Sequence, residues 1–258
     1  MDYQYILYEE RERVGMLTLN RPEKRNALSA DLLEELLSCI RKIKRENSVK
    51  VVILKGAGRH FCAGHDINEI MQMELNGIRH LFETCMDLMM LIQSISQPVI
   101  AQIEGIATAA GCQLVAASDL AVAEEEALFA TPGVKIGLFC TTPMVALSRA
   151  VGRKKALEML LTGRFISASE ARDYGLINSV VPSARLEEET WELARDIAQY
   201  SLVTIGIGKR AFYQQANMDD SQAYHYAKEV ISSNAVMADA REGMAAFLEK
   251  RKPVWKEK

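Results

Sequence analysis

The chain has 258 residues, of which 49% are hydrophobic, so it can bury the core of one large domain. Its 31 Lys and Arg residues are balanced by 34 Asp and Glu residues, and the net charge of −3 gives no electrostatic reason to expect a nucleic-acid partner. No stretch reaches the roughly 18 consecutive apolar residues that a membrane-spanning helix needs, so we expect no membrane partner.

The five cysteines are odd in number and scattered, with no CxxC pair and no Cys/His cluster. This pattern predicts reduced thiols and gives no support to a metal site. Residues 1–13 are polar and mixed in charge, unlike a secretory signal or a transit peptide. We therefore expect a cytoplasmic protein.

The first two-thirds of the chain alternate short apolar runs with helical patterns, which predicts an α/β architecture. Leucine and isoleucine repeat at helical spacing from Leu32 to Ile43, after the candidate N-cap Ser29, and small residues predict a second helix over 109–117. The runs that predict strands are 14–20, 49–55, 98–103, 119–123, 127–130 and 176–181.

From Arg185 onward the pattern is helical, with predicted helices at 186–200, 202–216, 221–236 and 241–250. We place a domain boundary near Ser183, which gives a core of 1–183 and a C-terminal helical region of 184–258. No low-complexity linker separates the two parts, so we expect them to pack together.

Two segments, CAGHDI (62–67) and GIATAAGCQL (105–114), place small residues where a turn opens toward a helix. The first N–H groups of a helix are unpaired and carry positive dipole character. Two such donors aimed at one point make an oxyanion hole, suited to a thioester carbonyl that becomes an enolate. Taken alone, the first segment is more simply an ordinary strand-to-helix loop, and the second is equally a site of close helix packing.

Together these segments resemble the crotonase superfamily, the enoyl-CoA hydratase/isomerase family. Three further runs, AAGCQLVA (109–116), FATPGV (129–134) and GLFC (137–140), are similar to its subgroup called enoyl-CoA hydratase domain-containing protein 3. The resemblance implies a crotonase-like spiral of ββα units with a C-terminal helical trimerisation region, assembled as a homotrimer or as a hexamer of two trimers. It also implies an acyl-CoA thioester as partner, with coenzyme A as part of the substrate and no permanently bound cofactor.

The same resemblance assigns the oxyanion hole to the main-chain N–H groups of His65 and Ala110. Gln113 stands where family hydratases carry their first catalytic glutamate, and an amide does not exchange a proton near pH 7. Gly133 stands in place of the second glutamate and has no side chain. The usual acid and base of hydration are therefore absent, and Gln113 is left to orient a water or a substrate group.

Two other side chains are candidates for moving a proton. Cys140 falls where family members place varied catalytic groups, and a thiol of lowered pKa can act there; a small buried hydrophobe is the simpler interpretation. The imidazole of His65 titrates near neutral pH, although the family recruits only the main chain of this position.

Substrate binding is assigned by the resemblance to two groups of residues. The nucleotide end of coenzyme A would meet Lys24 and Arg25, and C-terminal positions Phe247 and Lys250 would help to close the site. The remaining assigned positions are Ala27, Ala63, Asp66, Ile67, Asn68 and Gly133.

Three functions remain open: a hydratase or isomerase of enolate chemistry, a decarboxylase of the methylmalonyl-CoA type, and a non-catalytic acyl-CoA-binding protein. An acidic side chain inside the pocket, from Glu69, Glu104 or Asp119, would favour the first. A pocket without ionised carboxylates would favour the second, because a fixed carboxylate repels that of the substrate. Those decarboxylases carry a tyrosine near the position of Cys140, which this chain lacks.

Overall fold

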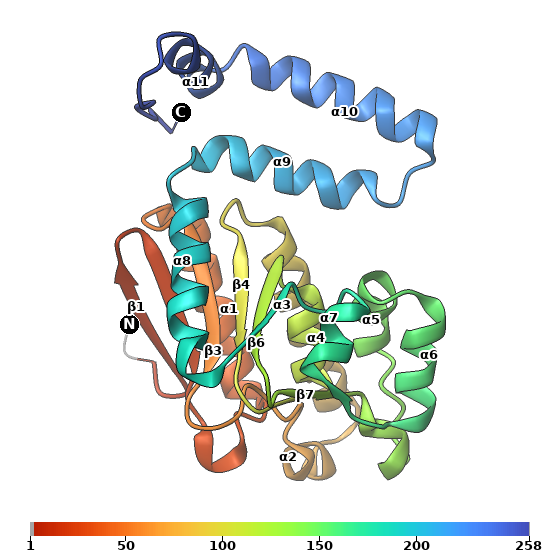
Figure 1. The fold of residues 1–258 in the computed structure, drawn as a ribbon. Coiled ribbons are helices and arrows are strands. Elements are labelled where there is room, and N and C mark those ends of the chain that lie inside the picture. The colour runs from red at the N-terminus through yellow and green to blue at the C-terminus, as the bar shows by residue number, and fades with distance from the viewer. Residues whose placement is uncertain (1–2, 258) are drawn as a thin grey trace.

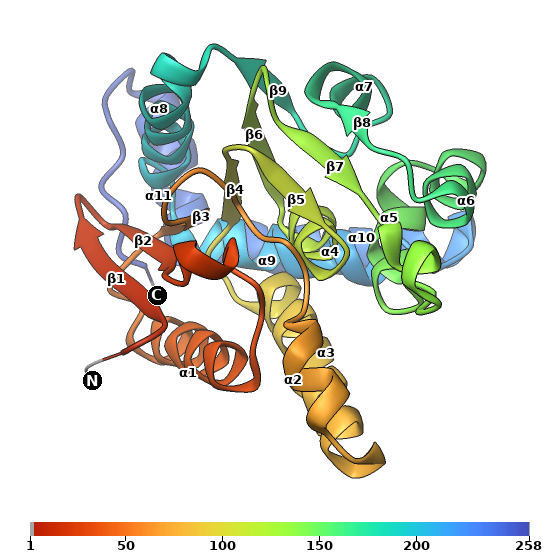
Figure 2. The ribbon, with the colours of Figure 1, turned by 90° about the horizontal axis from the view of Figure 1, so that it is seen from below.

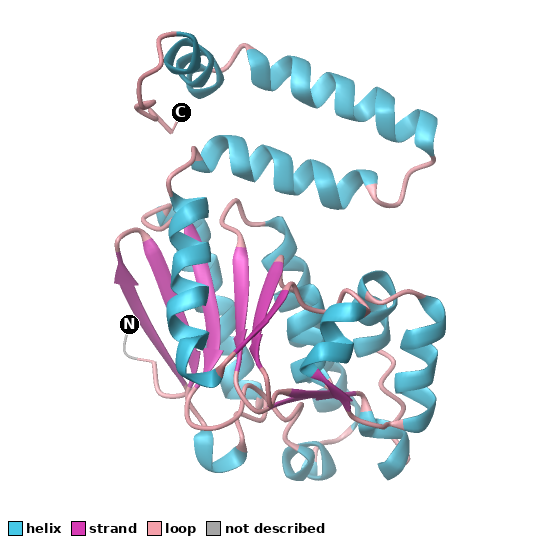
Figure 3. Ribbon diagram, in the orientation of Figure 1, coloured by secondary structure: helices cyan, strands magenta, loops and turns pink. Residues whose placement is uncertain are grey.

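The computed structural model describes residues 3–257; Met1, Asp2 and Lys258, which the predicted ranges 1–183 and 184–258 include, lie outside the described residues. Within the described part, six strands form the larger sheet in the order β1-β2-β3-β4-β6-β9 (Figures 1 and 3). Strands β1 and β2 pair antiparallel and the other neighbours pair parallel. These strands are β1 (Ile6–Arg11), β2 (Val14–Leu19), β3 (Val51–Gly56), β4 (Val99–Ile103), β6 (Leu120–Glu124) and β9 (Ser179–Val181). The predicted α/β architecture is confirmed.

The central strands are buried on both faces, which explains their nearly continuous apolar sequence. Successive side chains of β3 enter different cores: Val52 packs in the core that includes α1 (Ala30–Glu46) and α3 (Leu75–Ser94), whereas Val51 packs in the core under α8 (Leu186–Ala198). Helices thus cover both faces of the sheet, and the sheet serves as a rigid base for the loops at its ends.

Helix α1 begins at the predicted N-cap, where the Ser29 hydroxyl accepts a hydrogen bond from the N–H of Leu32 at 3.2 Å. Its partner α3 was not among the predicted helices, although its buried residues Leu81, Leu88 and Ile92 fall on one helical face. The two helices pack side by side and carry much of the larger core.

A smaller sheet of β5 (Ile106–Thr108), β7 (Leu128–Ala130) and β8 (Ile166–Ser167) lies beside α4 (Ala110–Ala117) (Figure 2). The chain enters it at Gly105, whose φ of +61° suits glycine and whose added Cβ would lie 2.1 Å from the carbonyl oxygen of Arg59. This turn directs the chain from β4 into β5 and then into the first turn of α4.

The remaining short elements lie in the connections around the two sheets (Figures 1 and 2). They are α2 (Ile67–Gln72), α5 (Pro143–Ala150), α6 (Arg153–Thr162), α7 (Ala168–Asp173), and the 3-10 helices η1 (Pro22–Lys24), η2 (Pro132–Ile136) and η3 (Ser183–Arg185). Across residues 3–257, we find no helix with the length and apolarity that crossing a membrane requires.

The C-terminal part is helical, as predicted, and continues from α8 into α9 (Leu202–Gln215), α10 (Asp220–Ala235) and α11 (Ala238–Leu248). Figure 1 shows α8 against the sheet, with α9 and α10 extending across one end of the molecule and α11 beside them. The division at 183/184 stays a prediction.

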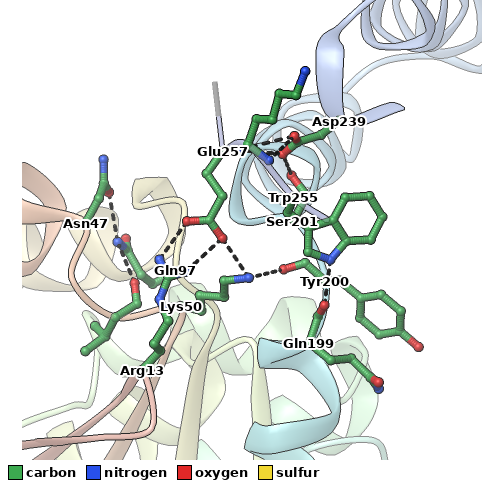
Figure 4. A network of polar contacts seen from close by, with 12 residues as sticks. Arg13, Asn47, Lys50, Gln97, Gln199, Tyr200, Ser201, Asp239, Trp255 and Glu257 are labelled. Carbon is green, nitrogen blue, oxygen red and sulfur yellow. Dashed lines mark hydrogen bonds and ion pairs between the residues drawn. The ribbon is translucent and has the colours of Figure 1, made fainter. Parts of the chain in front are cut away.

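A polar network fastens the chain after α11 to the sheet (Figure 4). The carboxylate of Glu257 accepts from Arg13 at 2.6 Å and from Lys50 at 2.7 Å. Asp239, at the start of α11, accepts from the N–H of Glu257 at 3.0 Å and from the Ser201 hydroxyl at 2.6 Å. These bonds fix α11 and the segment after it against the rest of the chain.

Candidate functional site

A cavity of about 280 Å³ lies where α2, α3, α4 and the loop from η2 to α5 meet. Four of its apolar side chains are exposed, as is common around a ligand site: Ile67, Ile136, Leu138 and Phe139. Other side chains in its wall are Ile70, Phe82, Ala109, Ala110 and Pro143, and the polar ones are His65, Cys140, Thr141 and Thr142; Gly133 completes it. It is therefore an apolar cavity with a few polar groups.

The N–H group of His65 is left free by the way its strand pairs. In the parallel bridge between Leu28 and His65, the N–H of Leu28 donates to the carbonyl of Gly64 at 2.7 Å, and the N–H of Asp66 donates to the carbonyl of Leu28 at 3.0 Å. These two bonds occupy the carbonyl of Gly64 and the N–H of Asp66, so the N–H of His65 itself takes no part in the bridge. Among residues 3–257, no group accepts a hydrogen bond from the His65 N–H.

A second N–H group is left free at the start of α4. The N–H of Ala109 donates to Ala130 at 2.9 Å, and the first bond of the helix runs from the N–H of Gln113 to the carbonyl of Ala109 at 3.0 Å. Ala110 is the first helical residue, and its N–H has no acceptor in the described part of the chain.

Two glycines bring these N–H groups to the same cavity. An added Cβ on Gly64 would lie 2.9 Å from the Cβ of Ala109 and 3.5 Å from the nitrogen of Ala110. An added Cβ on Gly111 would lie 2.2 Å from the carbonyl oxygen of Cys62. The turn before α2 and the first turn of α4 therefore pack at a distance that only glycine permits.

The main chain is strained at Ala109, the residue before α4. Its φ of 49° and ψ of −115° lie in a region that glycine enters easily and alanine does not. Backbone strain of this kind is concentrated at binding and catalytic sites.

Ala109→Gly is therefore expected to raise the free energy of unfolding by about 1 kcal/mol, because it relieves this strain. Urea denaturation measures the change. As a control, Ala116→Gly within the same helix should lower the same quantity by about 1 kcal/mol. If Ala109→Gly and Ala116→Gly lowered the free energy of unfolding equally, the main chain would not be strained at Ala109.

The His65 side chain lines the cavity and packs edge-on against Phe82, with 5.0 Å between ring centroids. Burial lowers the pKa of its imidazole to about 4. Its Nε2 is buried and has no hydrogen-bond partner among the described residues. The ring is therefore neutral at physiological pH and is a poor carrier of a proton there.

This lowered pKa makes stability depend on pH. As the pH falls below 6.5, the ordinary value, the unfolded His65 binds a proton that the folded one does not bind until about pH 4. The stability is thus complete above pH 6.5 and is lost progressively toward pH 4. Between pH 7 and pH 5 we expect this group to cost about 2 kcal/mol. Urea unfolding at pH 7 and pH 5 measures this change, and His65→Phe should lose about 2 kcal/mol less of its free energy of unfolding between them than the wild type does. Equal losses in the two proteins would refute a lowered pKa at His65.

Gln113 lies behind the cavity wall. The residue is 5% exposed and is not among those that line the cavity, and its Oε1 has no hydrogen-bond partner among residues 3–257. Gln113, which the resemblance places at the position of the first catalytic glutamate, is therefore a buried amide.

The space beside Gly133 is filled by the following loop. An added Cβ would lie 2.0 Å from the carbonyl oxygen of Leu138 and 2.8 Å from the Sγ of Cys140. Burial raises the pKa of the Cys140 thiol, although the N–H of Gly133 offsets part of this effect. Cys140 is therefore held in its protonated thiol form.

The three acidic residues considered from the sequence all lie outside the wall of this cavity. Glu69 accepts from the N–H of Ala30 at 3.1 Å. Asp119 pairs with Lys209 at 2.6 Å on the far side of α4. The pKa of Glu104 is raised by burial and by neighbouring Glu124. Within the described residues, no aspartate or glutamate lines the cavity.

A second, polar cavity of about 280 Å³ contains three of the predicted substrate-binding residues, Lys24, Asp66 and Asn68. Sequence reasoning missed Arg21, which pairs with Asp66 at 3.1 Å and donates to the carbonyl of Ala27 at 2.7 Å. The Asp66 carboxylate also accepts from the N–H of Asn68 at 3.2 Å, which caps α2. A polar cavity thus adjoins the turn that carries His65.

The other predicted residues are divided between two ends of the molecule. The carbonyl of Arg25 accepts from the N–H of Ala63 at 3.0 Å, so both belong to the loops beside the polar cavity. Phe247, which is 82% exposed, and Lys250 lie on or just after α11, at the opposite end of the chain from α2 (Figure 1). One chain therefore does not bring them to the cavity.

Comparison with known proteins supports the resemblance that the motifs suggested. A family model described as enoyl-CoA hydratase/isomerase matches residues 9–258. The chain is 48% identical, over 93% of its length and 79% of the relative, to the enoyl-CoA hydratase domain-containing protein 3, mitochondrial, of Homo sapiens. A probable enoyl-CoA hydratase of Rhizobium meliloti is 33% identical over 99% of both chains.

Two solved structures share the fold. The human enoyl-CoA hydratase domain-containing protein 3 superposes with a TM-score of 0.95 at 45% identity, covering 98% of this chain and 100% of the other. An enoyl-CoA hydratase of Mycobacterium smegmatis gives 0.95 at 45% identity, with 98% and 99% covered. The predicted crotonase-like fold with a C-terminal helical region, and the similarity to the domain-containing protein 3 subgroup, are confirmed.

The expectation of a cytoplasmic protein is wrong by the same comparison, because the similar proteins of Homo sapiens, Rattus norvegicus and Danio rerio are all named mitochondrial. A balanced net charge and unpaired cysteines do not distinguish the two locations. The fold, the matched residues and these relatives together establish that the chain belongs to the enoyl-CoA hydratase/isomerase family.

Proposed function

We propose that the chain binds an acyl-CoA thioester in the apolar cavity and polarises its carbonyl through the N–H groups of His65 and Ala110. The observation that carries this proposal is the pair of main-chain N–H groups on residues that line one cavity, neither of which has an acceptor among the described residues. Such donors stabilise the oxygen more strongly as negative charge develops on it. The resulting chemistry is that of a thioester enolate.

Ordinary hydration is not the reaction that these residues favour. Adding water across a double bond needs a base for the water and an acid for Cα. Gln113 has no ionisable group that could act as an acid or a base near pH 7, and Gly133 has no side chain. Cys140 and His65 do not replace them, because burial raises the pKa of the thiol and lowers that of the imidazole.

Decarboxylation is a second candidate, and the absence of Asp and Glu from the described cavity wall favours it. In this reaction the bond between Cα and the carboxylate carbon breaks, carbon dioxide leaves, and the electron pair forms the enolate. Cα then takes a proton from water. The protein must stabilise the oxygen and need not supply a carboxylate.

We assign the nucleotide end of coenzyme A to the polar cavity, where Lys24 would meet phosphate. The ester would bind transiently, with coenzyme A as part of the substrate and no resident cofactor. Phe247 and Lys250 would reach the cavity only from a neighbouring chain, which accords with a homotrimer or a hexamer. The mitochondrial names of several relatives support a mitochondrial place of action.

Mass-spectrometric turnover of a panel of enoyl-, 3-hydroxyacyl-, saturated and malonyl-type CoA esters, with calorimetric binding of each, tests the proposal. We expect saturable binding of at least one ester and no measurable binding of free pantetheine. Loss of carbon dioxide from a malonyl-type ester would select the second candidate. Failure of every ester to bind would reject acyl-CoA binding, whereas binding without product would leave the non-catalytic function.

A further inference from the structure

The imidazole of His65 is the ring that distinguishes this cavity from a plain apolar one. It shares the wall with apolar side chains and with Cys140, Thr141 and Thr142, and Phe82 packs edge-on against it. A neutral imidazole has one nitrogen that donates and one that accepts. Which nitrogen donates therefore decides what the cavity can recognise.

The two ring nitrogens are in different surroundings. Nε2 is sealed from solvent and has no hydrogen-bond partner among residues 3–257, whereas Nδ1 is not among the sealed polar atoms. In the main chain, a buried N–H without an acceptor is rarer than a buried carbonyl that lacks part of its partners, and we apply the same preference to the ring. This preference places the proton on Nδ1 and leaves Nε2 as the bare nitrogen. Nδ1–H is then a donor on the side of the ring that remains accessible.

Resting on the proposed function, we propose that Nδ1–H of His65 donates a hydrogen bond to an oxygen on C3 of the bound acyl group, so that the site prefers 3-hydroxyacyl- and 3-oxoacyl-CoA esters to saturated esters of equal length. Only Cα, Cβ and Cγ separate Nδ1 from the main-chain nitrogen that faces the thioester oxygen. The oxygen it contacts is therefore close to that carbonyl along the acyl chain.

The charge of the cavity selects a neutral oxygen over a carboxylate. No lysine or arginine lines it within the described residues. A carboxylate placed there would be buried without a cation, which is costly and counts against the decarboxylation candidate, whereas a hydroxyl or a ketone needs only one hydrogen bond. The imidazole supplies that bond.

Calorimetric dissociation constants for butyryl-, 3-hydroxybutyryl- and acetoacetyl-CoA test this role. The ratio between esters of the same length cancels contacts with the coenzyme A part. We expect the wild type to prefer the two oxygenated esters by about fivefold, the size of one net hydrogen bond. His65→Asn, whose amide nitrogen takes the position of Nδ1, should retain this preference, while His65→Gln and His65→Phe should lose it.

Retention of the preference in His65→Phe, or in His65→Gln but not His65→Asn, would overturn the proposal. Thr142→Val is the matched control for another polar group of the cavity, and loss of the preference in this variant alone would assign the contact to the hydroxyl. Preferential binding of malonyl-CoA with uptake of a proton would likewise overturn it. If no ester binds the wild type, acyl-CoA binding itself is rejected. If all three esters bind equally well, only the role of Nδ1–H is rejected.

Discussion

Gly133→Glu is expected to lower the free energy of unfolding by about 3 kcal/mol or more and to produce no hydration of an enoyl-CoA ester. The residue restores the carboxylate of family hydratases, but its Cβ would lie 2.0 Å from the carbonyl oxygen of Leu138. A backbone oxygen cannot move aside as a side chain does, so the loop from Gly133 to Cys140 must shift. Urea denaturation and mass-spectrometric assay of crotonyl-CoA measure the two effects.

Two controls separate the steric effect from the charge. Gly133→Ala carries the same Cβ without a carboxylate and should be destabilised to a similar extent. Gly208→Ala, on α9, adds a Cβ with nothing within 4 Å and should be neutral or stabilising by about 1 kcal/mol. A Gly133→Glu protein as stable as the wild type that hydrates crotonyl-CoA would contradict our account of this loop.

Gly64→Ala is expected to weaken acyl-CoA binding by about fivefold or more, because displacing one donor removes about one net hydrogen bond to the thioester oxygen. The added Cβ would press on the Cβ of Ala109 at 2.9 Å and would move the N–H of Ala110 away from that of His65. The φ of +98° adds backbone strain of roughly 1–3 kcal/mol. Calorimetry measures the affinity and urea denaturation the stability.

Gly152→Ala is the matched control for this strain. Its φ of +75° is also left-handed, but an added Cβ there meets nothing within 4 Å. It should therefore lose stability through its backbone conformation and keep its affinity for acyl-CoA. Unchanged affinity in Gly64→Ala would mean that the spacing of the two turns does not set the binding site.

The sequence predicts those parts of the fold whose signal is local. Strands such as β3 are continuous apolar runs, and α1 begins at a serine N-cap, so both are recognisable from neighbouring residues. Strand β1 was not predicted because Ile6 is its one buried residue, and the exposed Leu7 beside it breaks the alternation of apolar and polar residues. The short strands β5 and β8 exist because the chain turns back on itself, which no local pattern encodes.

The site was predictable to the extent that it is built from main chain. Small residues around Gly64 and Gly111 indicated two turns with free N–H groups, and the structure places both turns at one cavity. It was not predictable that the carbonyl of Leu138 fills the space beside Gly133, because this depends on how the loop five residues later folds. The pairing of Arg21 with Asp66 likewise joins segments far apart in sequence.

The vibrational frequency of the thioester carbonyl tests the central claim most directly. An acyl-CoA ester labelled with carbon-13 at the carbonyl would be bound to the protein, and its C=O stretch compared by isotope-edited infrared spectroscopy with that of the free ester. Two hydrogen bonds from His65 and Ala110 predict a shift to lower frequency, and a smaller shift in any Gly64→Ala complex that can be saturated. A bound ester whose carbonyl absorbs at the frequency of the free ester would contradict an oxyanion hole at this site.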